Sequence, residues 1–112
     1  MRAEFRDFSF KNHLKLFDVN VHGPYNHMQC FIDHMIKHKS GHIVGITSVH
    51  AKLTTAYRSS YGGSKHGFSG ILDSLRAEFS PYGITVTNIL PGYVRTNIAR
   101  NAYSVGEGQK FE

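Results

Sequence analysis

The sequence predicts an α/β fold in which two parallel strands accompany two long helices. Two short apolar runs, 42–48 and 84–90, are rich in β-branched residues, which is typical of strands covered on both faces of a sheet. Apolar residues spaced by three or four precede the first run and also separate the two runs, as in amphipathic helices. A strand, a helix and a strand in that order form a crossover unit, so the two strands are expected to be parallel.

Length and composition limit the chain to one small domain. It has 112 residues and a formal net charge of +5, from thirteen Lys and Arg against eight Asp and Glu. The basic residues are scattered and never form a run of four, so we expect no nucleic-acid interface. No apolar run approaches the roughly 18 residues of a membrane span, and the first residues do not form a signal-peptide core, so we expect no span in this chain.

The single cysteine, Cys30, has no partner for an internal disulfide. It lies among Met28, Phe31 and Ile32, and this apolar setting favours a buried thiol in a reducing compartment over a reactive one.

Eight histidines raise the question of a metal site. His34 and His38 are spaced to share one face of a helix, but zinc sites need three or four converging ligands and the sequence offers no third one. We therefore expect no metal centre.

The first predicted helix spans 10–38 and is expected to bend. Pro24 follows Gly23 in its middle, and a proline there removes a backbone donor and clashes with the preceding turn, so the bend should lie near Asn20 and free backbone polar groups there. Lys39, Ser40 and Gly41 then form a basic last turn followed by glycine, which predicts a left-handed cap. The preceding residues, 1–12, alternate charge with phenylalanine; they are interpreted as an ordered loop or, alternatively, as aromatics flanking a substrate entrance.

The second predicted helix lies between the two strand runs and ends at the segment Ser80-Pro81-Tyr82-Gly83. Five apolar residues form one stripe along it: Phe68, Ile71, Leu72, Leu75 and Phe79.

Tyr61 and Lys65 form the candidate reactive pair. They are four residues apart, so on a helix their side chains share one face, and the ammonium would favour the ionised phenol. Ser48 ends the first strand run, and ligand sites of such sheets lie beyond the carboxyl ends of the strands, so we expect Ser48 to converge on this pair. Alone, Tyr-x-x-x-Lys is also an ordinary surface pairing; Gly62-Gly63 beside the tyrosine and Pro91-Gly92 after the second strand make the combination specific.

Together these motifs resemble the short-chain dehydrogenase/reductase family over nearly the whole chain. The segment Asp18–Gly23 is also similar to the family's Asn-Val-x-Gly. The resemblance implies a partial Rossmann-type, doubly wound parallel sheet made of two strands and two long helices from the later, catalytic half of the domain. It further implies hydride transfer between a nicotinamide cofactor and a carbonyl or alcohol substrate.

The resemblance assigns four catalytic residues. Tyr61 would exchange a proton with the substrate oxygen, and Ser48 would orient that oxygen. Lys65 would support Tyr61 and hold the nicotinamide ribose hydroxyls, while Asn20 would anchor a water linked to the lysine. Without the other motifs, Asn20 would be interpreted as the cap of a broken helix.

The same resemblance places the segment after the second strand against the cofactor. A rigid proline followed by glycine lets the backbone approach a flat ring, so Pro91, Gly92 and Val94 are expected at the nicotinamide and Thr96 near a phosphate. Tyr61 and Lys65 complete this set, and the alternative for the segment is a tight strand-exit turn. The tail, 97–112, is expected to be a mobile lid over the substrate or a frayed end.

Three segments look most like a membrane-associated subgroup of the family, the acyl/alkyl-dihydroxyacetone-phosphate reductases: A-Y-R-S-S-Y-G-G-S-K-H-G, L-R-A-E-F and P-G-Y-V-R-T-N. This likeness implies NADP as cofactor, with NAD as the alternative, and a lipid-like substrate. For a full-length relative it implies association with the membrane of the endoplasmic reticulum or the peroxisome.

Departures from the family pattern support a second hypothesis. No Gly-rich phosphate loop follows a strand, so we expect 1–112 to be a partial NAD(P)-binding domain without the family's Gly-rich cofactor-binding half. Ala51 also replaces a frequent glycine. The chain would then be a truncated, non-catalytic fragment that acts as an interaction or dimerisation module, because uncovered strand edges pair with other chains. In the family the two long helices form the subunit interface, which implies a homodimer through 10–38 and 59–80.

Overall fold

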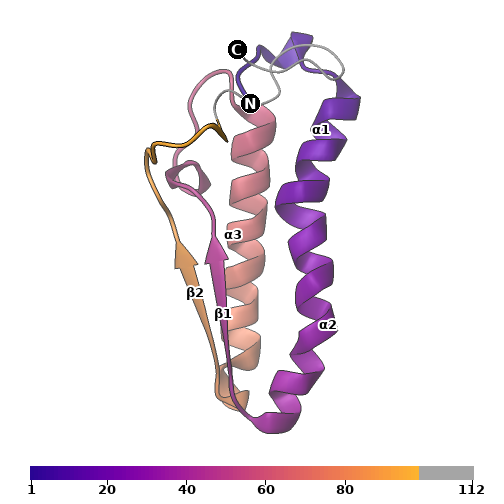
Figure 1. Cartoon of the computed structure of the whole chain (residues 1–112), viewed down its shortest axis with the longest axis vertical. Helices are drawn as coiled ribbons and strands as arrows, with labels where there is room; N and C mark the ends of the chain where they lie inside the picture. The colour runs from indigo at the N-terminus through magenta and orange to yellow at the C-terminus, as the bar shows by residue number, and fades with distance from the viewer. Residues whose placement is uncertain (99–112) are drawn as a thin grey trace.

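The computed structural model describes residues 1–98 and confirms the α/β class, with two long helical segments and a two-stranded parallel sheet (Figure 1). The helices are α1 (Phe10–Phe17), α2 (Gly23–His38) and α3 (Ser59–Phe79), and the strands are β1 (Gly41–Ile46) and β2 (Ile84–Ile89). Four short helical turns complete the order: η1 (Phe5–Asp7), η2 (Asp18–His22), η3 (Val49–Ala51) and η4 (Ser80–Tyr82). Most of the tail for which we predicted a lid or a frayed end, from residue 99 onward, lies outside the described residues.

The two strands pair in parallel, with Gly41 opposite Ile84 and Ile46 opposite Ile89. Both arrowheads in Figure 1 point toward the end of the molecule at which α3 begins. The residues that follow each strand therefore lie at the same end as the first turns of α3, as expected for a parallel crossover unit.

A π-helical turn, η2, joins α1 to α2 and contains Asn20, where the helix was predicted to be interrupted by a bend. The amide of Gly23 donates to the carbonyl of Asp18, five residues earlier. Pro24 has no amide to offer the carbonyl of Asn20, which is why the regular α-helical ladder is interrupted here. Turns of this kind occur frequently at functional sites.

The end of α2 differs from the prediction. The left-handed residue is Lys39, with φ 51°, and Gly41 already belongs to β1. A Cβ on Gly41 would lie 2.6 Å from Sδ of Met35, so a larger residue there would require the Met35 side chain to move, because the strand starts directly against the helix. The glycine therefore marks close packing and not a helix cap.

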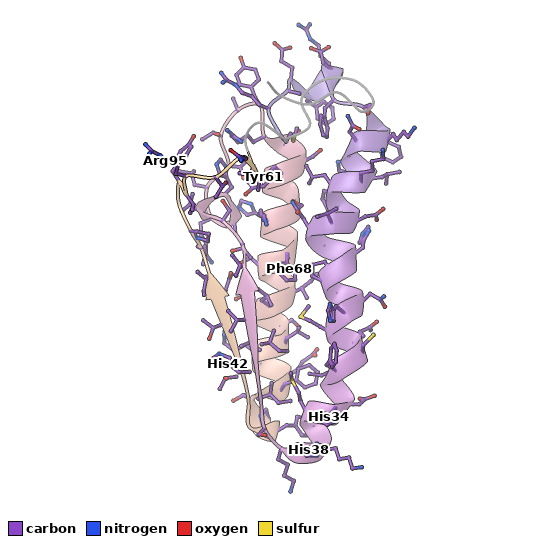
Figure 2. All side chains as sticks on the ribbon, in the orientation of Figure 1. His34, His38, His42, Tyr61, Phe68 and Arg95 are labelled. Carbon is purple, nitrogen blue, oxygen red and sulfur yellow. The ribbon has the colours of Figure 1, made fainter. Side chains whose placement is uncertain are left out.

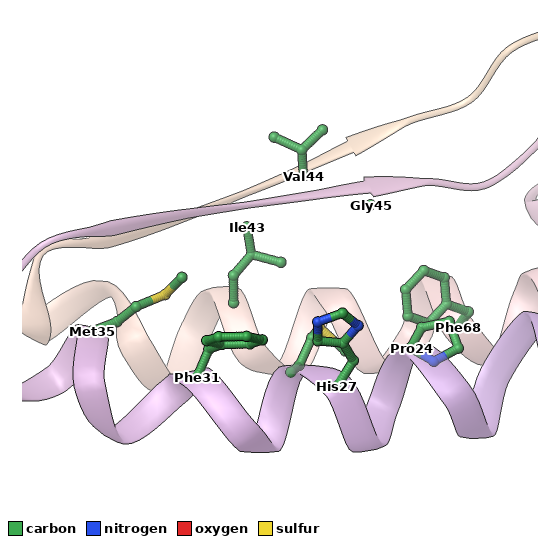
Figure 3. Close-up of a pocket in the computed structure, with 9 residues that line it drawn as sticks. Pro24, His27, Phe31, Met35, Ile43, Val44, Gly45 and Phe68 are labelled. Carbon is green, nitrogen blue, oxygen red and sulfur yellow. The ribbon is translucent and has the colours of Figure 1, made fainter.

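Within residues 1–98, the helices cover only one face of the sheet, so the expectation of strands covered on both faces is wrong here. Figure 3 shows Ile43 pointing toward α2 and Val44 pointing away from it. The outer face exposes 50% of Val44, 64% of Ile46 and 45% of Ile89. An apolar sheet face of this kind is normally covered in an α/β protein.

The buried core lies between α3, η2 and the inner face of the sheet. Leu72 is fully buried at its centre. The cluster consists of Val21, Phe68, Leu72 and Val86, with Phe17, Met28, Ile43, Ile71 and Leu75 packed against it. The predicted apolar stripe of α3 thus supplies two of the four buried members and two of the surrounding ones.

Cys30 is exposed, which corrects the expectation of a buried thiol. Met28 and Ile32, which are partly buried, each lie two residues away, or about 200° around a helix of 3.6 residues per turn. The apolar neighbours in sequence therefore occupy another face of α2, and the thiol hydrogen-bonds the carbonyl of Asn26 at 3.3 Å.

Of the helices within residues 1–98, none combines the length and the apolar character needed to cross a membrane.

Candidate active site

Tyr61 and Lys65 share one face in the first turns of α3, at the end of the molecule toward which both strands point (Figure 2). The Nζ atom of Lys65 lies 5.6 Å from the centroid of the Tyr61 ring. Burial lowers the pKa of the Lys65 ammonium below its ordinary value. No carboxylate within residues 1–98 lies at ion-pair distance from it. The lysine is therefore a partly buried cation whose recorded neighbour is the tyrosine.

Asn20 is connected to Tyr61 through Ser64. Nδ2 of Asn20 donates to Oγ of Ser64 at 3.0 Å, and this hydroxyl donates to the backbone carbonyl of Tyr61 at 2.7 Å. Ser64 is fully buried. The π-helical turn that carries Asn20 is thus fastened to the first turn of α3.

Ser64 was not singled out in the sequence, although it directly precedes Lys65 and lies three residues after Tyr61. On a helix that spacing places it one turn from Tyr61, within reach of the tyrosine's carbonyl. The sequence could not identify its hydrogen-bond partner, Asn20, because that residue lies on a helical turn 44 residues away.

Replacing Ser64 with Ala is expected to lower the free energy of unfolding by about 1–3 kcal/mol, because Nδ2 of Asn20 and the Tyr61 carbonyl would lose a buried partner. Urea denaturation followed by circular dichroism measures this. Ser74→Ala, at an exposed position of the same helix, is the control and should change stability by less than about 0.5 kcal/mol. Equal effects of the two variants would show that the bridge does not stabilise the site.

Ser48 lies directly after β1, where it is buried and begins η3. Its Oγ accepts a hydrogen bond from the amide of His50 at 3.1 Å. The amide of Val49 donates to the carbonyl of Pro91 at 3.3 Å. The structure thus brings Ser48 and Pro91 to the same edge of the sheet.

His50, which the sequence analysis did not single out, is the middle residue of η3 and its ring contacts the ring of Tyr61. The two rings are in edge contact, with centroids 5.6 Å apart and planes at 75°. Nδ1 of His50 is buried without a hydrogen-bond partner among the described residues. Burial, and then the positive charges of Arg58 and His66, lower the pKa of His50. The ring beside the tyrosine is therefore kept neutral near pH 7.

The segment between η3 and α3 packs closely on the helix at Gly62. A Cβ there would lie 2.2 Å from Cγ2 of Thr54, so only glycine permits this approach. The hydroxyl of Thr54 in turn donates to the carbonyl of His50 at 3.1 Å. The glycine beside Tyr61 is required for the position of the loop that carries His50.

The segment that enters α3 is held by the first residues of the chain. The amide of Ala3 donates to the carbonyl of Tyr57 at 3.1 Å, and Nη1 of Arg58 donates to the carbonyl of Met1 at 2.9 Å. Tyr57 has a φ of 66°, a left-handed conformation that residues other than glycine seldom adopt. These contacts fix the turn immediately before Tyr61.

The remaining predicted cofactor residues lie on the exposed segment after β2. Gly92, Val94 and Thr96 are exposed, and Oγ1 of Thr96 accepts a hydrogen bond from the amide of Ile98 at 3.3 Å. Within residues 1–98 no recorded hydrogen bond or ring contact joins them to Tyr61 or Lys65, so their roles stay predictions.

His34 and His38 stack with their ring centroids 4.2 Å apart near the end of α2, far from Tyr61 in Figure 2. In the described part of the chain, no group of three or more His, Cys, Asp or Glu side chains could hold a metal ion.

The sequence profile of the short chain dehydrogenase family matches residues 1–105. Dehydrogenase/reductase SDR family member 7B of Xenopus tropicalis is 45% identical over 94 residues, which are 84% of this chain and 30% of the frog protein. The Mus musculus protein of the same name is 37% identical over 97 residues, 87% of this chain and 30% of that protein. The chain thus spans less than a third of the length of these relatives. Its assignment to the later half of the domain stays a prediction.

Solved structures show the same arrangement of elements. A short-chain dehydrogenase from Streptomyces avermitilis superposes with a TM-score of 0.86 at 28% identity, covering 96% of this chain and 40% of that one. A gluconate 5-dehydrogenase from Burkholderia cenocepacia, solved with NADP and tartrate, gives 0.85 at 29% identity over 89% of this chain and 39% of that one.

Proposed function

Because the chain belongs to the short-chain dehydrogenase/reductase family, we propose that it carries the proton-transfer site of an oxidoreductase that moves hydride between NADP(H) and a carbonyl or alcohol substrate. The observation that supports this most directly is the Lys65 ammonium held 5.6 Å from the Tyr61 ring with no carboxylate partner among residues 1–98. A cation placed there stabilises the phenolate that forms when the tyrosine gives up its proton.

In the proposed reaction, the Tyr61 hydroxyl donates its proton to the substrate oxygen in reduction and takes it back in oxidation. The bound nicotinamide supplies or accepts the hydride. The Ser48 hydroxyl hydrogen-bonds the same oxygen and orients it, and Lys65 stabilises the charged tyrosine. Asn20 acts at a distance, because it holds Ser64 and thereby the backbone of Tyr61.

The residues present fit a nicotinamide cofactor. Lys65 has three donors and no anionic partner within residues 1–98, so its ammonium is available to ribose hydroxyls. Pro91, Gly92, Val94 and Thr96 would hold the nicotinamide end. We propose NADP over NAD on the likeness to the reductase subgroup; the Burkholderia structure was solved with NADP.

The same likeness leads us to propose a lipid-like substrate and, for a longer form of this protein, association with the endoplasmic reticulum or peroxisomal membrane. We also propose a homodimer through the long helices. An apolar depression between α2 and α3 supports it, lined by Tyr25, Met28, Gln29, Ile32, Leu75, Glu78 and Phe79.

Titration calorimetry of the purified chain with NADPH and NADH tests the cofactor proposal, with circular dichroism to establish folding. We expect saturable binding of NADPH, and we expect Lys65→Met to weaken it about ten-fold or more, since hydrogen bonds from a charged donor contribute about 1.5–3 kcal/mol. Lys52→Met, at an exposed position after η3, is the control and should bind as the wild type does. A folded chain that binds neither cofactor would contradict the proposal.

One observation favours a second function, that of a non-catalytic interaction module. The outer sheet face is apolar and exposed, and an apolar groove of about 240 Å³ lies between α2 and β1 (Figure 3). The groove is lined by Pro24, His27, Met28, Phe31, Met35, Ile43, Val44, Gly45 and Phe68. Such surfaces and free strand edges promote association with other chains.

Sedimentation of two charge variants distinguishes the surfaces. If chains associate through the sheet, Ile46→Lys should shift the wild-type oligomer toward monomer while Tyr25→Lys, in the depression between α2 and α3, should not. If they associate through the helices, the reverse should hold. A monomeric wild type at high concentration would exclude self-association as the function.

A further inference from the structure

The imidazole of His50 is not explained by the proposed reaction. Within residues 1–98, its Nδ1 is the single buried side-chain nitrogen or oxygen that has no hydrogen-bond partner. Buried polar atoms are nearly always satisfied, and the exceptions cluster at functional sites. The ring also contacts Tyr61, so the exception lies beside the residue that would transfer the proton.

The burial of Nδ1 determines where the ring carries its proton. A buried N–H group without an acceptor is rarer in proteins than a buried acceptor without a donor. The neutral ring therefore keeps Nδ1 as the bare acceptor and places its proton on Nε2. The lowered pKa of His50, due to burial and to the charges of Arg58 and His66, agrees with a neutral ring at pH 7.

Nε2 consequently offers a donor at the surface of the site. It makes no hydrogen bond within residues 1–98, and it is nevertheless not among the buried atoms that lack a partner, so unlike Nδ1 it is accessible. With the two ring centroids 5.6 Å apart, one small molecule can contact both the tyrosine and the histidine. A small number of placed polar groups is enough to fix the orientation of a ligand.

We propose that His50 is a specificity-determining residue, whose Nε2–H donates a hydrogen bond to a second oxygen of the substrate, within two carbons of the carbonyl or alcohol carbon at which Tyr61 acts. The inference rests on the proposed function for the identity of that carbon. The preferred substrates are hydroxy ketones, vicinal diols and their esters and ethers, over ketones that lack the second oxygen.

Two groups besides burial lower the pKa of the His50 ring. Arg58 enters from the segment before α3 and His66 from α3 itself, and both act on His50 as positive charges. His66 is turned to other partners, since its Nδ1 lies 2.9 Å from the carbonyl of Gly62 and 3.4 Å from the hydroxyl of Thr54. His50 is the histidine of this pair whose ring contacts that of Tyr61.

The test uses a matched pair of probes, 1-hydroxy-2-butanone and 2-butanone, added to the ¹⁵N-histidine-labelled chain in the presence of NADP⁺. Nuclear magnetic resonance reports the tautomer of His50, and His50→Gln identifies its signals. We expect the proton on Nε2, and we expect the hydroxy ketone to shift the His50 signals at about five- to ten-fold lower concentration than 2-butanone, as one hydrogen bond of about 1 kcal/mol allows.

Two variants separate a binding role from a structural one. His50→Gln keeps an N–H donor at a similar distance and should retain the preference for the hydroxy ketone, as measured by binding or by the ratio of kcat/KM values. His50→Leu should lose it and treat both ketones alike. If the leucine variant does not fold, the His50 tautomer of the wild type and the response of its signals to the two ketones still test the proposal.

The outcomes distinguish this inference from the proposed function. A preference that depends on His50 without any turnover would support the inference and contradict the proposed activity. Turnover of both ketones at equal kcat/KM by wild type and His50→Leu would support the activity and overturn the inference. A proton on Nδ1, or no response of His50 to the hydroxy ketone, would overturn the inference whatever the turnover.

Discussion

Replacing Tyr61 with Phe is expected to abolish turnover, lowering kcat by at least about a hundred-fold, which is the lower range for losing a general acid or base. The variant removes only the hydroxyl. In the described part of the chain that hydroxyl makes no hydrogen bond, since the bonds recorded for Tyr61 involve its backbone amide and carbonyl. The fold should therefore be retained.

Oxidation of NADPH at 340 nm with a panel of carbonyl substrates measures this effect, and circular dichroism measures the fold. Tyr57→Phe is the matched control, since this exposed tyrosine lies just before α3 and has no assigned role in the chemistry. Turnover by Tyr61→Phe within a few-fold of wild type would remove Tyr61 from the reaction. Loss of turnover in both variants would indicate that the substitutions disturb the structure at the start of α3, and not the proton transfer.

Leu72→Ala is expected to lower the free energy of unfolding by about 2–5 kcal/mol, the range for truncating a buried leucine. Leu72 is 0% exposed and lies in a core cluster of four buried residues. A domain of this size has only about 5–15 kcal/mol in total, so the change removes a large share of its stability.

Urea denaturation at pH 7 provides the measurement. Leu53→Ala is the matched control, because Leu53 is 75% exposed and the same truncation there should cost less than about 0.5 kcal/mol. A loss below 1 kcal/mol for Leu72→Ala would show that the cluster is not tightly packed in solution.

Local sequence patterns predicted the elements well. The apolar spacing gave α3 to within a residue or two, and Pro24 gave the position at which the first helix is interrupted. These signals act over a few residues, because helix periodicity and the missing proline amide depend on neighbours in the chain.

Features that depend on distant packing were predicted less well. Cys30 sits among apolar neighbours in sequence but faces away from them on the helix. Lys39 adopts the left-handed conformation, while Gly41 already belongs to β1 and packs against Met35. The outer faces of the strands have a composition typical of burial, yet no helix of residues 1–98 covers them.

The candidate site was predicted in part for the same reason. Tyr61 and Lys65 are near in sequence, so their spacing determines their contact. Ser64 matters because it hydrogen-bonds Asn20, which lies 44 residues away in the sequence. His50 matters because its ring contacts Tyr61, which belongs to a different element. Only the three-dimensional structure shows those pairs.

The π-helical turn η2 also sets the rotational phase between α1 and α2. Such a turn accommodates one more residue than the α-helix does, and each residue advances an α-helix by about 100°. Deleting one residue of Asp18–His22 would turn every downstream side chain of α2 by that angle relative to α1. Met28 would then leave the core against which it packs. The extra residue therefore changes the rotation of α2 relative to α1. As a result, one continuous helical segment directs Asn20 toward α3 and an apolar stripe toward the sheet.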